Sequence, residues 1–305
     1  MEKNIVFNED SFKRVKHKIE QTEVDYERSL LWRIGYALKQ NKLAIVCLAV
    51  LIIIALASIF AFLSPYDPDA MDLPNKLQTP SAKHLFGTDN LGRDYFTRAL
   101  YGGRVSLTVG VFAMIISVCV GTVFGTVAGY VGGVVDTLMM RFVDIFMSVP
   151  SFLLIIIINT LITPNIGTMI FIIGMFAWMG VARIVRAETM SIKERDYILA
   201  AKSMGGKNVW IIVKHIIPNV VPLVIVAASI SIARAILTES SLSFLGFGVQ
   251  LPMSSWGSML QDAQKYILEL PLLAFFPGLF ILLTVLSFNI LGDILRNALE
   301  PRIMK

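Results

Sequence analysis

Six long apolar stretches constrain this chain more than any other feature of its sequence. They cover residues 43–63, 105–129, 139–162, 166–185, 217–240 and 272–292. Each is close to the ~20 residues that an α-helix needs to cross a bilayer. A helix satisfies its own backbone hydrogen bonds where water is absent, so we predict an all-α integral membrane protein with six transmembrane helices. Pro150 lies inside the third stretch and is expected to kink or break that helix.

The composition agrees with this class. Hydrophobic residues make up 55% of the 305 residues and charged residues only 16%, and a water-soluble domain could not keep so much apolar surface from solvent. The net charge of +5 does not indicate nucleic-acid binding, because most basic residues lie beside the apolar stretches, where they set orientation and contact anionic lipid. Cys47 and Cys119 lie inside apolar stretches and are expected to be buried thiols.

Lysine and arginine residues predict the topology. They are concentrated before the first apolar stretch, between the fourth and fifth, and after the sixth. With six crossings these three segments lie on one side of the membrane, and the positive-inside rule assigns that side to the cytoplasm. Both termini are therefore expected in the cytoplasm.

The same pattern suggests how the chain is organised. We expect a cytosolic tail with an interfacial helix over 1–42, a first membrane helix over 43–63, an extracytoplasmic segment over 64–103, a main membrane domain over 104–293 and a cytosolic C-terminus over 294–305. Residues 29–42 place apolar side chains on one helical face. They fit either a helix on the membrane surface or a plain extension of the first membrane helix.

The charged segment 186–215, between the fourth and fifth apolar stretches, has the pattern of a short helix–turn–helix. Helical spacing follows Asp196 and includes Leu199, Ala200, Ala201 and Met204. Gly205 and Gly206 are expected to end this helix, and Asn208 to cap a second one that runs to Pro218. Such a unit, held against a membrane domain, is suited to docking a soluble partner; an ordinary cytosolic loop is the alternative.

Few charges lie within the apolar stretches. Arg141 and Asp144 are three residues apart near the start of the third stretch and are expected to pair, whereas Arg234 and Glu239 lie in the outer part of the fifth. We interpret all four as structural, with a role in transport as the alternative. Polar residues that could line a path, or else join helices by hydrogen bonds, are Ser106, Thr108, Ser117, Asn159, Thr160, Ser229 and Ser231.

Two further patterns bear on packing and chemistry. Gly121, Gly125 and Gly129 recur every four residues and predict close approach of another helix. The nearest match to a nucleotide-binding loop, beginning at Gly205, lacks the upstream glycine and the Ser/Thr. The pattern suggests no catalytic, cofactor or metal residues. A mid-membrane acid typical of proton- or sodium-driven carriers does not stand out either, which favours a separate energy source.

The segment 199–218 resembles the cytoplasmic signature of ABC-importer permeases, which reads Glu-Ala-Ala, three residues, Gly, nine residues, Ile-x-Leu-Pro. Ala200, Ala201, Gly205 and Pro218 match it, whereas Leu199 replaces the glutamate. His215 and Ile217 are also departures. The stretches 84–107, 144–154, 238–260 and 291–302 resemble, more narrowly, the C-type permease of dipeptide, oligopeptide and nickel importers.

This resemblance implies a type I importer permease fold for 104–293 and a subunit that carries peptides, or nickel or a metal chelate. It implies a second homologous permease in a heterodimer, two cytosolic ATPases that bind ATP and Mg, and an extracytoplasmic binding protein, in a bacterial plasma membrane. Residues 196–209 would sit in a groove of one ATPase. Residues 64–104 and 252–271 would receive the binding protein or only cap the bundle. Outside this family, the residues also leave open an ion-coupled secondary transporter and a membrane enzyme.

Overall fold

The structure, a computed structural model, describes residues 30–162 and 165–299. Residues 1–29 of the predicted segment 1–42, most of the loop 163–165 and residues 300–305 lie outside these ranges. Within them the chain is helical apart from turns and one isolated bridge between Thr88 and Asp94. Five helical segments are long and apolar enough to cross a membrane, and a bent pair of helices supplies a sixth when counted as one span. The predicted six crossings are compatible with this count.

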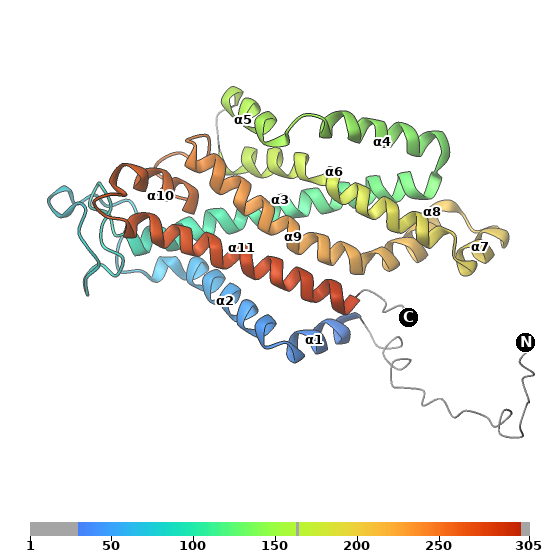
Figure 1. Cartoon of the computed structure of the whole chain (residues 1–305), viewed down its shortest axis with the longest axis horizontal. Coiled ribbons are helices and arrows are strands. Elements are labelled where there is room, and N and C mark those ends of the chain that lie inside the picture. Colours follow the sequence, from blue (N-terminus) through green and yellow to red (C-terminus); the bar gives the residue numbers. More distant parts are fainter. Residues whose placement is uncertain (1–29, 163–164, 300–305) are drawn as a thin grey trace, which may run out of the picture.

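Eleven α-helices follow one another along the described ranges (Figure 1). They are α1 Leu30–Gln40, α2 Lys42–Ile59, α3 Tyr95–Val131, α4 Gly133–Met147, α5 Ser151–Leu161, α6 Ile166–Lys193, α7 Asp196–Ser203, α8 Asn208–Ile211, α9 Ile217–Phe244, α10 Trp256–Ala263 and α11 Leu272–Leu299. Short 3-10 turns extend α2 over Phe60–Leu63 and follow α10, and a π-helical turn over Ile212–Ile216 joins α8 to α9.

The amphipathic segment before the first span forms a helix of its own, α1. Asn41 separates it from α2, since its side chain accepts hydrogen bonds from the amides of Leu43 and Ala44 and so begins a new helix. Arg33 donates to the carbonyl oxygen of Ala298 at 2.9 Å, which brings α1 against the end of α11. Of the two interpretations, the structure favours a separate helix over an extension of α2.

The second span begins earlier than its hydropathy predicts. Helix α3 starts at Tyr95 rather than at residue 105, because the Asp94 side chain caps it by accepting from the amide of Thr97 at 2.8 Å. Polar residues in this first part, such as Arg98, are buried against the preceding segment rather than exposed to lipid. A hydropathy average along the sequence leaves these residues out of the predicted span, because it scores their polarity and not their burial.

Pro150 breaks the third span, as predicted. Helices α4 and α5 meet at an angle of 73° around it, with Pro150 preceding the first turn of α5. Both helices lie along α6, away from α2 and α11 (Figure 1). The fourth, fifth and sixth spans continue beyond their predicted ends at 185, 240 and 292, because α6, α9 and α11 carry on through polar residues as far as Lys193, Phe244 and Leu299.

The glycine ridge of α3 lies against α6, which confirms the predicted close packing. A Cβ atom on Gly121 would lie 2.7 Å from the carbonyl oxygen of Trp178, and one on Gly125 would lie 2.4 Å from that of Ala182. These separations are below any normal contact, so only glycine allows the two backbones to approach this closely. Cys119 differs from its prediction: it is exposed on α3, whereas Cys47 is buried as expected.

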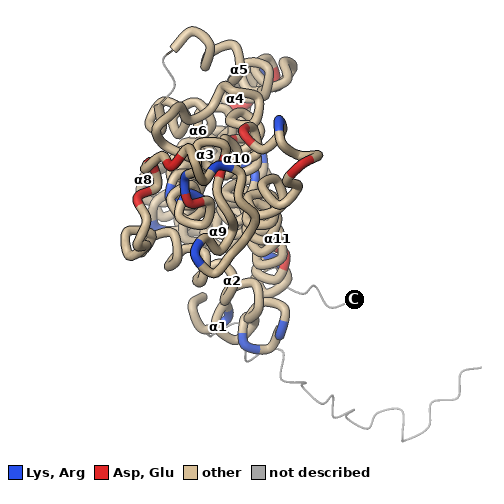
Figure 2. The backbone as a smooth tube through the Cα atoms, turned by 90° about the vertical axis from the view of Figure 1, so that its left-hand side faces the viewer, with Lys and Arg blue, Asp and Glu red and all other residues tan. Residues whose placement is uncertain are grey.

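The two ends of the bundle differ in what they carry. One end holds residues 64–94 and α10, and the other holds α7, α8, α1 and the last turns of α11 (Figure 1). Figure 2 looks onto the first end and shows acidic and basic residues on its loops. The same end of the bundle therefore holds α1, the α7–α8 unit and the end of α11, as the predicted topology requires.

Candidate functional site

The predicted helix–turn–helix is present at the end of the bundle opposite α10. Helix α7 covers Asp196–Ser203 and ends on Met204, whose amide bonds to the carbonyl oxygen of Ala200 at 2.9 Å. Asp196 lies in its first turn, where a negative charge interacts favourably with the helix dipole. Helix α8 begins at Asn208, and Pro218 lies exposed in the first turn of α9.

Gly205 makes the turn between α7 and α8. Its φ of +81° lies in the left-handed region, where side chains other than glycine are strained. The amide of Gly206 then bonds to the carbonyl oxygen of Ala201 at 3.0 Å, which closes the end of α7. The chain thereby reverses direction within two residues and presents both short helices together.

Buried isoleucines hold this unit to the membrane bundle. Ile198 of α7 and Ile211 of α8 are 2% and 0% exposed, and they pack with Ile192 and Val185 of α6 in one core cluster. Ala201 packs against the same cluster. Because its inner face is packed into the body, the unit can move with α6 and α9 rather than as a loose loop.

The outer face of the unit is apolar and exposed. Met204 is 87% exposed and Leu199 is 47% exposed, and Ala200 is exposed beside them. The structure adds two residues that the helical pattern did not single out, Val209 at 73% and Trp210 at 50%. The sequence could have indicated both, because they are large apolar residues within a charged segment. We call Leu199, Met204, Val209 and Trp210 the docking face.

Asn208 does not cap the second helix as predicted. Lys207 occupies the position before α8 and makes no side-chain cap, and Asn208 is the first helical residue. Its side-chain oxygen instead accepts a hydrogen bond of 3.0 Å from the Tyr130 hydroxyl near the end of α3. This contact ties the unit to a second long helix.

The predicted pair between Arg141 and Asp144 is wrong. Asp144 pairs with Arg183 of α6 at 2.5 Å, and the Arg141 side chain has no ion-pair or hydrogen-bond partner within the described residues. A second pair lies beside it, since Arg186 donates to both carboxylate oxygens of Asp136. Helix α6 is thus linked to α4 shortly before the chain enters α7.

Arg234 and Glu239, the two charged residues noted in the fifth stretch, do not pair with each other. They are five residues apart on α9, which places them on different helical faces. Glu239 is fully buried and accepts hydrogen bonds from Ser106 at 2.8 Å and Ser243 at 2.7 Å, whereas Arg234 is exposed. The structural interpretation of Glu239 is supported by these bonds, but its partners are serines and not a cation.

The polar residues suggested for a transport path include some that are buried and one that lines a cavity. Ser106 and Ser117 are fully buried, and Ser117 donates to the carbonyl oxygen of Met114 at 2.9 Å. Asn159 is also buried and donates to the carbonyl oxygen of Phe247. Ser106 bonds across to α9, Ser117 bonds within α3, and Asn159 bonds to the segment after α9. None of these three lines the cavity between α6, α9 and the junction of α4 with α5, whereas Ser231 does.

At the opposite end, residues 64–94 pack against α10 and α11, since Phe86 stacks on Phe276 of α11 and joins an apolar cluster with Met259 of α10. Buried Arg93 pairs with buried Asp89 at 2.7 Å, and Trp256 donates its ring N–H to the carbonyl oxygen of Ala99 at 3.0 Å. Burial raises the pKa of the Asp262 carboxyl on α10, while the charge of Arg98 acts in the opposite direction. The exposed apolar residues of this end include Met71, Leu73 and Leu268.

Comparison with known proteins gives consistent similarities. A family model described as binding-protein-dependent transport system inner membrane component matches residues 121–305, and one described as the N-terminal transmembrane domain of oligopeptide transport permease C matches residues 29–80. The chain is 41% identical to a dipeptide transport system permease protein of Bacillus subtilis, over 90% of this chain and 85% of that protein.

Two further similar proteins are named for the transport of oligopeptides and of glutathione. An oligopeptide transport system permease protein of Haemophilus influenzae is 42% identical over 97% of this chain and 96% of its own length. A glutathione transport system permease protein of Escherichia coli is 39% identical over 87% of this chain and 88% of its own length.

Proposed function

Because the chain belongs to the family of binding-protein-dependent transport system inner membrane components, we propose that it is the permease subunit of an ATP-driven importer that carries peptides. The relatives are named for dipeptides, oligopeptides and glutathione, which are all peptides. These names favour a peptide cargo over nickel or a metal chelate. The chain would form half of the translocation path in a bacterial plasma membrane.

In this proposal the chain itself catalyses nothing. Two cytosolic ATPase subunits bind ATP and Mg and supply the energy, and the α7–α8 unit docks into a groove on one of them. The observation that carries this is the docking face, which combines exposed apolar side chains outside with a packed isoleucine layer inside. Closure of the ATPases would move the unit, and through α6 and α9 the membrane bundle.

The way the α7–α8 unit is attached indicates which helices a movement of the ATPases would displace. The unit joins α6 to α9 and contacts Tyr130 of α3, and α6 is in turn tied to α4 by the Arg186–Asp136 pair. A displacement of the docking face would therefore act on four helices together. ATP shifts the two states of such a bundle only through its different affinity for each of them.

The remaining two partners would meet other surfaces of the bundle. An extracytoplasmic binding protein would dock on the end formed by residues 64–94 and α10, where Met71, Leu73 and Leu268 are exposed. The buried Asp89–Arg93 pair would support that surface from within. A second, homologous permease would complete the path as a heterodimer, with both chain termini of this subunit on the ATPase side.

Co-purification tests the proposal most directly. A tagged copy expressed with its neighbouring genes and extracted in mild detergent is expected to retain a second six-helix protein and two ATPase subunits. The complex is expected to show ATPase activity that rises with peptide-loaded binding protein and is inhibited by vanadate. Uphill uptake by the isolated chain in vesicles, driven by an ion gradient alone, would instead establish the ion-coupled carrier.

A further inference from the structure

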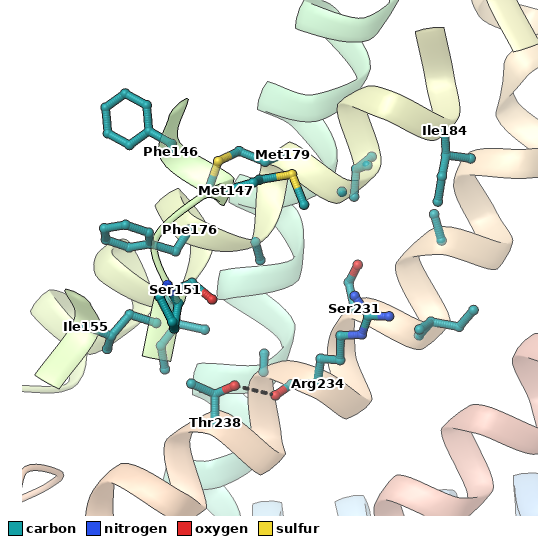
Figure 3. Close-up of a pocket in the computed structure, with 18 of the residues that line it drawn as sticks. Phe146, Met147, Ser151, Ile155, Phe176, Met179, Ile184, Ser231, Arg234 and Thr238 are labelled. Atoms are coloured by element: carbon teal, nitrogen blue, oxygen red, sulfur yellow. Dashed lines mark hydrogen bonds between the residues drawn. The ribbon is translucent and has the colours of Figure 1, made fainter. Parts of the chain in front are cut away.

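A cavity of about 460 Å³ opens beside the broken third span. Its wall is formed by the junction of α4 and α5, by α6 and by α9 (Figure 3). Pro150 lies at the 73° bend between α4 and α5 and lines the cavity, which extends from this bend to α9. The cavity is large enough to hold a few amino-acid residues of an extended peptide.

Arg234 is the one charged residue among those that line the cavity. It lies on α9 about 25 Å from Ile217 and about 15 Å from Phe244 at 1.5 Å per residue. Because α9 continues beyond the predicted end at residue 240, Arg234 lies deeper in the span than the outer position that the sequence predicted. Its side chain is exposed and has no ion-pair or hydrogen-bond partner within the described residues. In Figure 3 it lies beside Ser231, across the cavity from Met147 and Met179.

A lone arginine at this depth is costly against lipid and is found facing water or a negative charge. The cavity wall therefore faces something other than lipid in the assembled transporter. The rest of the wall is mostly apolar, with methionine and phenylalanine side chains from α4 and α6. Methionine adapts its shape to different neighbours, which suits a wall that contacts varied side chains.

On the basis of the proposed peptide transport, we infer that Arg234 binds the C-terminal carboxylate of a peptide as it passes through this cavity. Every linear peptide with a free C-terminus carries this group, whatever its sequence. Arginine binds carboxylates through two parallel N–H donors. One fixed contact to a shared group, on a wall that adapts to side chains, would let one path serve many sequences.

The alternative partner for Arg234 is an acidic residue of the second permease. That pairing would make Arg234 a contact between subunits and would not depend on the cargo. The two are separated by comparing peptides that differ only at the C-terminus, because a subunit contact is indifferent to that change.

The experiment uses the whole transporter in vesicles, with its binding protein, and compares uptake of a free-acid peptide with the same peptide amidated at its C-terminus. Binding of each to the binding protein is measured first, and both are used at saturating concentration. For the unaltered transporter we expect uptake of the free acid to be roughly three- to tenfold faster. Arg234→Gln is expected to lower free-acid uptake to the rate of the amide, and Arg234→Lys to restore part of the difference.

Arg141→Gln is the matched control, since it removes the same charge from an exposed position outside the cavity and should leave the ratio unchanged. Equal uptake of both peptides by the unaltered transporter, or an unchanged ratio in Arg234→Gln, would overturn the assignment while leaving peptide transport in place. Loss of the second permease from the purified Arg234→Gln complex would assign the arginine to the subunit contact. Absence of any peptide uptake by the unaltered transporter would reject the proposed function itself.

Discussion

Ser106 donates a hydrogen bond of 2.8 Å to Glu239 across the contact between α3 and α9, and both side chains are fully buried. Ser243 donates to the other oxygen of the same carboxyl group at 2.7 Å. The amide of Trp256 in turn donates to the Ser106 hydroxyl at 3.3 Å. One carboxyl group thus connects two membrane helices with the first residue of α10.

Replacing Glu239 tests how far this connection stabilises the bundle. Glu239→Leu keeps a similar volume but leaves buried hydroxyl groups without their acceptor, at a cost of about 1–3 kcal/mol in the free energy of unfolding. Glu239→Gln keeps one acceptor oxygen and is expected to lose less. Thermal unfolding of the purified complex in detergent would measure both. Leu237→Ala, at an exposed position nearby, serves as the control, and equal midpoints for the Leu and Gln variants would refute the role of the hydrogen bonds.

The glycine ridge predicts a contrast between two Gly→Ala changes. Gly125→Ala places a Cβ atom 2.4 Å from the carbonyl oxygen of Ala182, so α3 and α6 must separate, at a cost of about 1–3 kcal/mol. Gly180→Ala meets no atom within 4 Å and is expected to be neutral or to stabilise α6 by about 0.5–1 kcal/mol. Membrane yield and the midpoint of thermal unfolding would report the difference. A Gly125→Ala variant as stable as Gly180→Ala would show that the helices do not approach this closely.

The turn at Gly205 predicts an effect of backbone strain without collision. Nothing lies within 4 Å of a Cβ atom built there, so any substitution acts through its φ of +81°. Gly205→Val is expected to destabilise the turn by about 1–2 kcal/mol or more and to reduce peptide-stimulated ATPase activity. Gly205→Asn, which tolerates the left-handed region, should retain most of it. Equal activity in the two variants would mean that the turn geometry is not needed for coupling.

The docking face predicts a charge-sensitive contact. Met204→Glu places a charge on the most exposed apolar residue of this face and should reduce the amount of ATPase subunit that co-purifies, without changing insertion of the permease. Ser191→Glu adds the same charge at an exposed position near the end of α6 and is the control. Quantitative immunoblotting of the purified complex would compare the two. Full retention of the ATPase by Met204→Glu would exclude this face as its docking site.

Much of the architecture could be predicted from the residues in order. The six apolar stretches mark the spans because crossing a bilayer requires a long apolar helix, and length and hydropathy are properties of one segment. Pro150 marks the break and Gly205 marks the turn for equally local reasons, since proline lacks an amide donor and glycine accepts a positive φ. The four-residue glycine spacing indicated a close contact, although not that α6 would be the partner.

Only the tertiary structure decided which side chains meet. Asp144 could have paired with Arg141 on its own helix, but the packing of α4 against α6 brings Arg183 to it instead. Glu239 and Arg234 belong to one helix and share no contact, because one face of α9 is buried against serines and another borders a cavity. Contacts between distant segments depend on how whole helices pack, and burial then sets the cost of every polar group left without a partner. The sequence therefore determined the helices and their breaks. The packing determined which charged residues pair, which side chains form the docking face and where the cavity lies.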